Sequence, residues 1–223
     1  MIRSEIRSRI RKKLGETTQV FWTDAELNSG MEDAQKDIVW KAKLKRTRGT
    51  FTTTATARYV LTTILPRFMR VCDGGVYIYD SGTTDWTKVT YRTKDDMVAE
   101  YGDGWVNADA ATPIHYMEDL DENIIELWPT PQTSNVGTDY CRVYYCATPT
   151  AMSADASTPD LDAQGLLHPA IVDHVVATGF EARGYWDIAN DVWAKYYDKI
   201  KSYMVEKNTK EDEDVVTKSY RNL

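Results

Sequence analysis

The sequence predicts an α+β protein in which N- and C-terminal helices form a helical bundle and the middle of the chain supplies a β-rich insertion. Apolar residues recur every three or four positions near both ends of the chain, which is the spacing of a buried helix face. The middle instead consists of short runs rich in Val, Thr and Tyr, separated by Gly and Asp. With 223 residues, the chain is long enough for one large domain or two small ones.

Residues 1–49 predict the first two helices of the bundle. The first helix spans residues 2–14, with an apolar residue at every fourth position, and Gly15 is well suited to end it. The second helix begins after residue 23. Its apolar face consists of Leu27, Met31, Ala34, Ile38 and Ala42.

The stretch FWTDAEL, residues 21–27, predicts the start of this second helix. Thr23 and Glu26 match the capping-box pattern, in which a hydroxyl and a carboxylate each bind a free backbone amide. Trp22 and Leu27 occupy the two positions of a hydrophobic staple. Asp24 complements the positive end of the helix dipole. We therefore interpret the two carboxylates as structural rather than catalytic.

The predicted end of the same helix is strongly basic. Cations near a helix C-terminus are favoured by the negative end of the helix dipole, and a solvated helix end of this kind is the interpretation that we favour. Contact with phosphate is the alternative that the sequence leaves open. The cluster consists of Lys41, Lys43, Lys45, Arg46 and Arg48.

Residues 50–148 predict the β-rich insertion. Residues 50–65 indicate two strands around a small turn, and residues 68–93 indicate strands joined at Asp73-Gly74-Gly75 and at Ser81-Gly82. A short helix stopped by Gly102 follows. The remaining segments predict a hairpin with the polar tip DLDEN and one more strand over 139–147.

The C-terminal part predicts a linker, two further bundle helices and a tail. Residues 149–167 are rich in Ala, Ser, Thr, Asp and Pro, which is typical of a surface linker. Helical spacing returns over 168–207, and Pro169 suits a first helical turn. Residues 208–223 form a charged tail with little periodicity, which predicts disorder for this segment in isolation.

Composition excludes several classes of protein. No apolar run is long enough for a membrane helix, and the charged N-terminus lacks the apolar region of a secretory signal, so we expect cytoplasmic synthesis. The three cysteines, Cys72, Cys141 and Cys146, lack C-x-x-C spacing, which favours free, buried thiols. The net charge is −7, and such an acidic protein can surround nucleic acid but is not built to coat it.

Charge is distributed unevenly along the chain. Residues 1–50 hold 12 Lys and Arg against 7 Asp and Glu, whereas the rest of the chain holds 15 against 27. The aromatic residues of the middle could stack on bases, but few basic residues alternate with them. We therefore assign these aromatic side chains to core and interface packing.

No motif for catalysis or cofactor binding is present. The sequence lacks the phosphate-binding, dinucleotide-binding, zinc-protease and serine-hydrolase patterns. His168 and His174 are six residues apart, which does not place two metal ligands on one helix face, and His115 lies in a predicted strand. We predict no metal site, no cofactor and no catalytic residue.

Acidic clusters are the remaining candidates for chemistry, because glycosidases need only two carboxylates. One cluster comprises Glu118, Asp119, Asp121 and Glu122 at the predicted hairpin tip, and another lies at 211–214 in the tail. Water at a hairpin tip screens charge and leaves little to raise a pKa, so we interpret the first cluster as a solvated turn. The tail cluster meets the same objection.

The order of several segments resembles a known family. An N-terminal helix ending in LGE is followed by FWTDAELNSGMEDAQKDI, ATARYVL, LPRFMRV, TPIHYMED, IIELWPTP and RVYYCATPTAMSADASTPDL, before two C-terminal helices. This order over roughly residues 1–207 resembles the head-to-tail connector, or adaptor, proteins of tailed bacteriophages. The β-rich middle is longer than in the smallest adaptors.

The resemblance implies a structural, non-enzymatic role in the neck of a virion assembled in the host cytoplasm. Such adaptors form a ring, commonly a dodecamer, under the portal protein, contact a tail or neck protein, and leave a channel through which DNA passes without specific binding. Their C-terminal segments reach the portal. We therefore expect portal contacts from Val215, Val216, Tyr220 and Leu223.

Two alternatives remain open at this point. The acidic cluster is compatible with a virion-associated peptidoglycan hydrolase that uses Glu118 and Glu122. A different neck component, such as a stopper or a tail-completion protein, would share the features of an adaptor.

Overall fold

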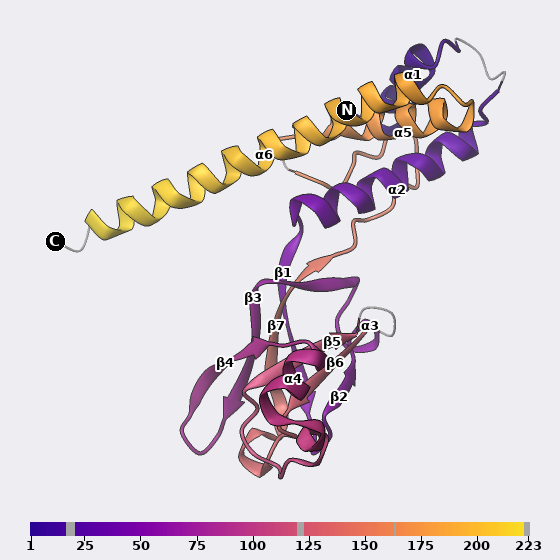
Figure 1. Ribbon diagram of the computed structural model, residues 1–223. Coiled ribbons are helices and arrows are strands. Elements are labelled where there is room, and N and C mark those ends of the chain that lie inside the picture. Colours follow the sequence, from indigo (N-terminus) through magenta and orange to yellow (C-terminus); the bar gives the residue numbers. More distant parts are fainter. Residues whose placement is uncertain (17–20, 120–122, 163, 221–223) are drawn as a thin grey trace. The chain divides into compact units, whose positions relative to one another are not determined.

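The structure, a computed structural model, describes residues 1–16, 21–119, 123–162 and 164–220 (Figure 1). Side chains are described up to Lys207, apart from Asp73. The chain forms two compact units. Met1–Leu44 and Pro149–Leu223 form the helical unit, and Lys45–Thr148 form the sheet unit.

The predicted fold class was wrong. The chain adopts a mixed α/β fold dominated by a seven-stranded sheet, with helices mainly towards the two ends, rather than a helical bundle that carries a β insertion. The sheet unit has its own hydrophobic core, which includes Leu61, Val76 and Ile125. Local periodicity identifies helices and strands, but it does not reveal which of them bury a common core, because strand pairing joins distant parts of the chain.

The sheet has the strand order β1-β7-β3-β4-β5-β6-β2. Strands β4 and β5 are parallel, and the other neighbours are antiparallel. The sheet unit also contains the short helices α3 (Leu61–Ile64) and α4 (Lys94–Tyr101). The strands are β1 (Arg46–Thr53), β2 (Arg58–Val60), β3 (Phe68–Asp80), β4 (Asp85–Tyr91), β5 (His115–Asp119), β6 (Ile124–Trp128) and β7 (Gly137–Ala147).

Several local predictions in the sheet unit are confirmed. Strands β5 and β6 form the predicted hairpin, and β3 and β4 are joined through residues 81–84. Helix α4 ends at Gly102, as predicted. Strand β7 covers the predicted final strand. The three cysteines are buried and free.

The predicted turn at Asp73-Gly74-Gly75 was wrong, and strand pairing is non-local. Residues 50–65 contain parts of the two predicted strands, β1 and β2, but these do not pair with each other; β1 pairs with β7, and β2 pairs with β6. Gly74 and Gly75 do not form a turn. They lie within β3, where the register with β7 shifts between Val71 and Val76. A Cβ at Gly74 would lie 2.4 Å from the Tyr144 ring, so this close approach requires glycine.

The helical unit consists of α1 (Arg3–Lys13), α2 (Asp24–Ala42), α5 (His168–Ala182) and α6 (Trp186–Tyr220). Helix α5 packs against the other three helices. Helix α2 ends at Ala42 because Lys43 adopts a left-handed conformation with φ 48°. The predicted basic helix end was therefore wrong for Arg46 and Arg48, which belong to β1.

A buried carboxylate joins three helices of this unit. Asp173 on α5 is fully buried and accepts a hydrogen bond from Lys13 Nζ of α1 at 2.6 Å. Its other oxygen accepts from Lys199 Nζ of α6. Both lysines keep part of their side chains in water. A buried charge is stable only when it is paired, so this contact restrains the placement of α1 and α6 on α5.

A second buried carboxylate lies beside the first helix. Glu16 is buried and pairs with Arg183, which follows α5, and with Arg11 of α1 at 3.5 Å. It also accepts a hydrogen bond from the backbone amide of Trp22 at 3.3 Å. The chain leading into α2 is thereby fixed to α1 and to the end of α5.

Replacement of both Lys13 and Lys199 by Met should lower the free energy of unfolding by about 3–5 kcal/mol, because Asp173 would remain buried without a cation. Adding Asp173→Asn to that double variant should recover most of the loss. Urea denaturation of the three proteins measures both effects. Failure of Asp173→Asn to restore stability would show that the lysines act through packing rather than charge.

Candidate assembly interface

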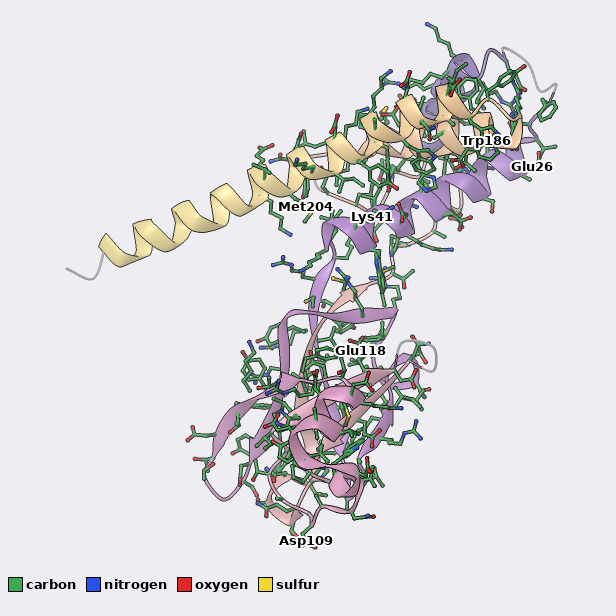
Figure 2. All side chains as sticks on the ribbon, viewed as in Figure 1. Glu26, Lys41, Asp109, Glu118, Trp186 and Met204 are labelled. Atoms are coloured by element: carbon green, nitrogen blue, oxygen red, sulfur yellow. The ribbon has the colours of Figure 1, made fainter. Side chains whose placement is uncertain are left out.

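The start of α2 has the geometry of a capping box. Thr23 Oγ1 accepts a hydrogen bond from the Glu26 amide at 3.2 Å, and Glu26 Oε2 accepts from the Thr23 amide at 2.8 Å. The hydrogen bond from the Thr23 amide lowers the pKa of the Glu26 carboxyl, and a hydrogen bond from the Thr23 hydroxyl adds to this effect. The Thr23 hydroxyl also donates to Glu26 Oε2, and Glu26 is labelled at the start of α2 in Figure 2. The site fixes the entry of the chain into α2 rather than presenting a reactive carboxylate.

Asp24 also ties α2 to the first helix. Its Oδ1 accepts a hydrogen bond from Arg11 Nη2 at 2.6 Å and lies 3.6 Å from Arg7 Nε. The hydrogen bond from Arg11 lowers the pKa of Asp24, and the charge of Arg7 adds to this effect. The residue therefore forms a specific ion pair between helices in addition to the dipole interaction expected from its position.

The two aromatic residues before the cap lie close to the end of α5. Phe21 is largely exposed and packs under the guanidinium of Arg183, with 4.6 Å from Cζ to the ring centroid. The Phe21 and Trp22 rings contact edge to face. Trp22 also lines a cavity together with Leu27, the second residue of the predicted staple.

Large apolar side chains are exposed along α6. Trp186 has 61% of its surface exposed and Val205 has 59%, at opposite ends of the described part of the helix. Large exposed apolar groups on one element often mark a protein contact surface. Trp186 is labelled at the start of α6 in Figure 2. The exposed large apolar residues of this helix and the preceding loop are Tyr185, Trp186, Ile188, Tyr197 and Val205.

The residues predicted to contact the portal come after these exposed residues in the sequence. Sequence periodicity gives no helix after residue 207, whereas α6 extends to Tyr220. The backbones of Val215, Val216 and Tyr220 thus belong to α6. Their side chains, and the whole of Leu223, lie outside the described residues.

Comparison with protein families identifies the chain. A family model described as SU10 adaptor protein matches residues 1–219. The chain belongs to the SU10 adaptor protein family. The resemblance to phage head-to-tail adaptors is therefore confirmed. A comparison with curated proteins finds no match.

Family membership makes this adaptor a structural bacteriophage protein of the virion neck, which interacts with other virion components. The match extends beyond the roughly 207 residues in which the sequence order was recognisable. It includes 208–219, the larger part of the charged C-terminal segment.

Glu118 departs from the expectation that water screens the acidic cluster. It lies in β5 on the same face as the buried Tyr116 and opposite the buried Ile125 of β6. Burial raises the pKa of Glu118, and a hydrogen bond from the Val71 amide at 3.1 Å offsets part of this effect. Since Val71 borders the irregularity in β3, Glu118 satisfies an amide where the pairing of β3 with β7 shifts.

One other described residue of the acidic cluster shares a cavity with Glu118. Asp119 is the next residue of β5 and lines the same open cavity as Glu118, as do Asp95 and Glu126. Asp121 and Glu122 lie outside the described residues. Glu118 itself lines an open cavity of about 490 Å³ that also includes Arg58 and Arg92.

The three histidines of the adaptor are separate from one another. His115 in the sheet unit is stacked on Trp128 and lies 3.0 Å from the Tyr101 hydroxyl. His168 begins α5, and His174 lies within it. Burial lowers the pKa of each histidine. Among the residues that the structure describes, no group of three potential ligands suits a metal ion.

No described helix has both the length and the apolar character needed to cross a membrane.

Sequence reasoning missed the contacts that hold the start of α2. Arg11, Glu16 and Arg183 gave no motif, because their pairing depends on helices that are distant in sequence. It also missed the cavity beside Trp22, which His174 and Gly30 line. The one available signal was a glycine inside an otherwise regular helical pattern.

Thr23→Ala should lower the free energy of unfolding by about 1 kcal/mol through loss of the α2 cap. Thr93→Ala is a matched control, because Thr93 and Asp96 form the same capping box at the start of α4. Both variants should lose similar stability, but only Thr23→Ala should increase hydrogen exchange at the start of α2. Equal exchange in the two variants would contradict this assignment.

Glu118→Gln should become more stable relative to the wild type as the pH rises from 4 to 7. The raised pKa of Glu118 means that its contribution to stability is fully present below the unfolded pKa and is lost as the pH rises through the folded pKa. Urea denaturation at the two pH values measures the difference. Asp85→Asn, at an exposed site on β4, is the control, and an equal pH dependence would refute the prediction.

Proposed function

We propose that this adaptor is a non-enzymatic connector that forms a closed ring under the portal and joins the capsid to the tail. The family match over residues 1–219 is the observation that carries the proposal. The ring commonly has twelve copies in proteins that this sequence resembles. We propose the same number here, with assembly in the host cytoplasm.

The exposed apolar residues of α6 support a role in protein contacts. A closed ring needs two different, complementary surfaces on each subunit. Trp186 and Tyr197 offer large aromatic area of the kind that is enriched at protein interfaces. The helical unit thus exposes aromatic side chains that suit one of the two surfaces. The sheet unit has its own hydrophobic core.

Net charge supports the passage of DNA without specific binding. The chain carries a net charge of −7, and repetition of this charge around a ring gives a channel environment that repels phosphate. Such a wall lets the genome pass without a stable complex.

The C-terminal segment is the part that we assign to the portal. Val215, Val216, Tyr220 and Leu223 place four apolar side chains among charged residues. Apolar anchors in a charged segment suit docking into a groove of a partner. A tail or further neck protein binds elsewhere on the ring.

The hydrolase alternative has one supporting observation, the raised pKa of the Glu118 carboxyl beside an open cavity. A glycosidase requires a second carboxylate at a defined distance. Activity on purified cell walls, lost in Glu118→Gln, would favour the enzyme. No activity, together with portal attachment, favours the adaptor over the hydrolase. A stopper or tail-completion protein would instead bind a preassembled neck and not the bare portal.

Deletion of residues 208–223 should abolish attachment to the portal and leave the fold intact. Electron microscopy and mass measurement of the protein mixed with portal rings measure attachment, and circular dichroism measures the fold. A full-length variant with Val215, Val216 and Tyr220 changed to Ser should lose attachment as well. Thr217→Ser is the conservative control. Attachment of the deleted protein at wild-type strength would remove the proposed role of this segment.

A further inference from the structure

The helical unit contains a cavity of about 130 Å³ beside the start of α2. Its walls come from α2 and α5, together with Leu14 and Trp22. Leu14, Leu27 and Val175 are buried and supply an apolar floor. This volume is well above the roughly 10–15 Å³ that a single water molecule needs. The cavity has the size and lining of a receptor for one long side chain.

The rim of the cavity is acidic. Glu26, Gly30 and Asp33 all line it and follow one another on α2 at steps of four and three, so they form a single stripe on that helix. Both carboxylate side chains are exposed. Lys36 lies 3.3 Å from Asp33, in a solvent-exposed pair that contributes little. An occupant with a positive charge would be attracted to this rim.

Two residues that line the cavity each have a buried nitrogen with no hydrogen-bond partner among the described residues. They are Trp22 Nε1 and His174 Nδ1. The other ring nitrogen of His174 lies 3.9 Å from Asp37 Oδ2, on the side away from the unpaired atom. A buried polar group without a partner costs about 1–3 kcal/mol.

Gly30 keeps the cavity open at the expense of helix stability. Glycine inside a helix is about 0.5–1 kcal/mol less favourable than alanine. A Cβ at Gly30 would meet the Val175 methyl groups at 3.4 Å, which is tight but borders on ordinary contact. Gly30 does not have a positive φ, so its conformation does not require glycine. The missing methyl group enlarges the cavity.

We propose that this cavity receives a lysine side chain from a neighbouring chain of the assembled neck. The inference rests on the proposed adaptor function and names the chemistry of one of its contacts. The four methylene groups lie on the floor formed by Leu14, Leu27 and Val175, and the ammonium group lies at the acidic rim. Lysine fits better than arginine because its ammonium group is compact and its stem is slender.

Zero-length carbodiimide cross-linking tests the contact directly, because it joins carboxylates to amines that touch. Wild-type adaptor bound to portal rings is cross-linked, digested and examined by mass spectrometry. The expected product joins Glu26 or Asp33 to a lysine of another chain. Asp33→Asn should reduce that product, whereas Glu32→Gln, at the adjacent position of α2 outside the cavity, should not.

Gly30→Ala separates assembly from folding. The free subunit should have the same or a higher melting temperature, because alanine favours the helix, while attachment to the neck should weaken at least tenfold. Gly104→Ala is the control, since a Cβ there meets nothing within 4 Å and Gly104 lies in the sheet unit. That control should attach like the wild type.

The outcomes distinguish this inference from the proposed function. Wild-type attachment with no intermolecular cross-link at Glu26 or Asp33, and with Gly30→Ala attaching normally, overturns the lysine contact and leaves the adaptor function standing. A wild-type protein that never attaches to a portal overturns both. Cross-links confined to lysines of the same chain also overturn the inference.

Discussion

The pairing of the Asp173 carboxylate with Lys13 and Lys199 is the constraint on which the helical unit depends. Asp173 is buried at the centre of α5, the helix that contacts all the others in its unit. A charge in this position must be neutralised by a partner, so α1 and α6 are held where their lysines reach it. Since both lysines remain partly in water, the unit gains this restraint without burying three charges.

The same cost of isolated polar groups explains other features of the molecule. Glu16 satisfies the Trp22 amide at the entry to α2, and Glu118 satisfies the Val71 amide where β3 loses regular pairing. Both residues accept hydrogen bonds from backbone amides that have no acceptor within a regular helix or strand. Glu118, which belongs to an acidic cluster in the sequence, therefore has a structural role.

Two residues with unsatisfied nitrogens line the cavity of the helical unit. The nitrogens are Trp22 Nε1 and His174 Nδ1, and Gly30 keeps the cavity open. In our proposal, Gly30 lowers the stability of α2 in the free subunit, and contact with a neighbouring chain offsets this cost. In this view the capping box at Thr23 and Glu26 has two uses, because it starts α2 and positions one wall of the proposed lysine pocket.

The sequence by itself determined the local elements and the family. The cap at Thr23, the β5–β6 hairpin and the stop at Gly102 depend on residues close together in the chain, so short patterns were sufficient. Motif order was sufficient for the adaptor family, because it needs no geometry. Tertiary structure alone decided the fold class, the strand pairing, the end of α2 and the partial burial of Glu118. These features depend on contacts between distant segments, such as β1 with β7 and Asp173 with Lys13, and their energies come from burial and pairing that no local pattern encodes.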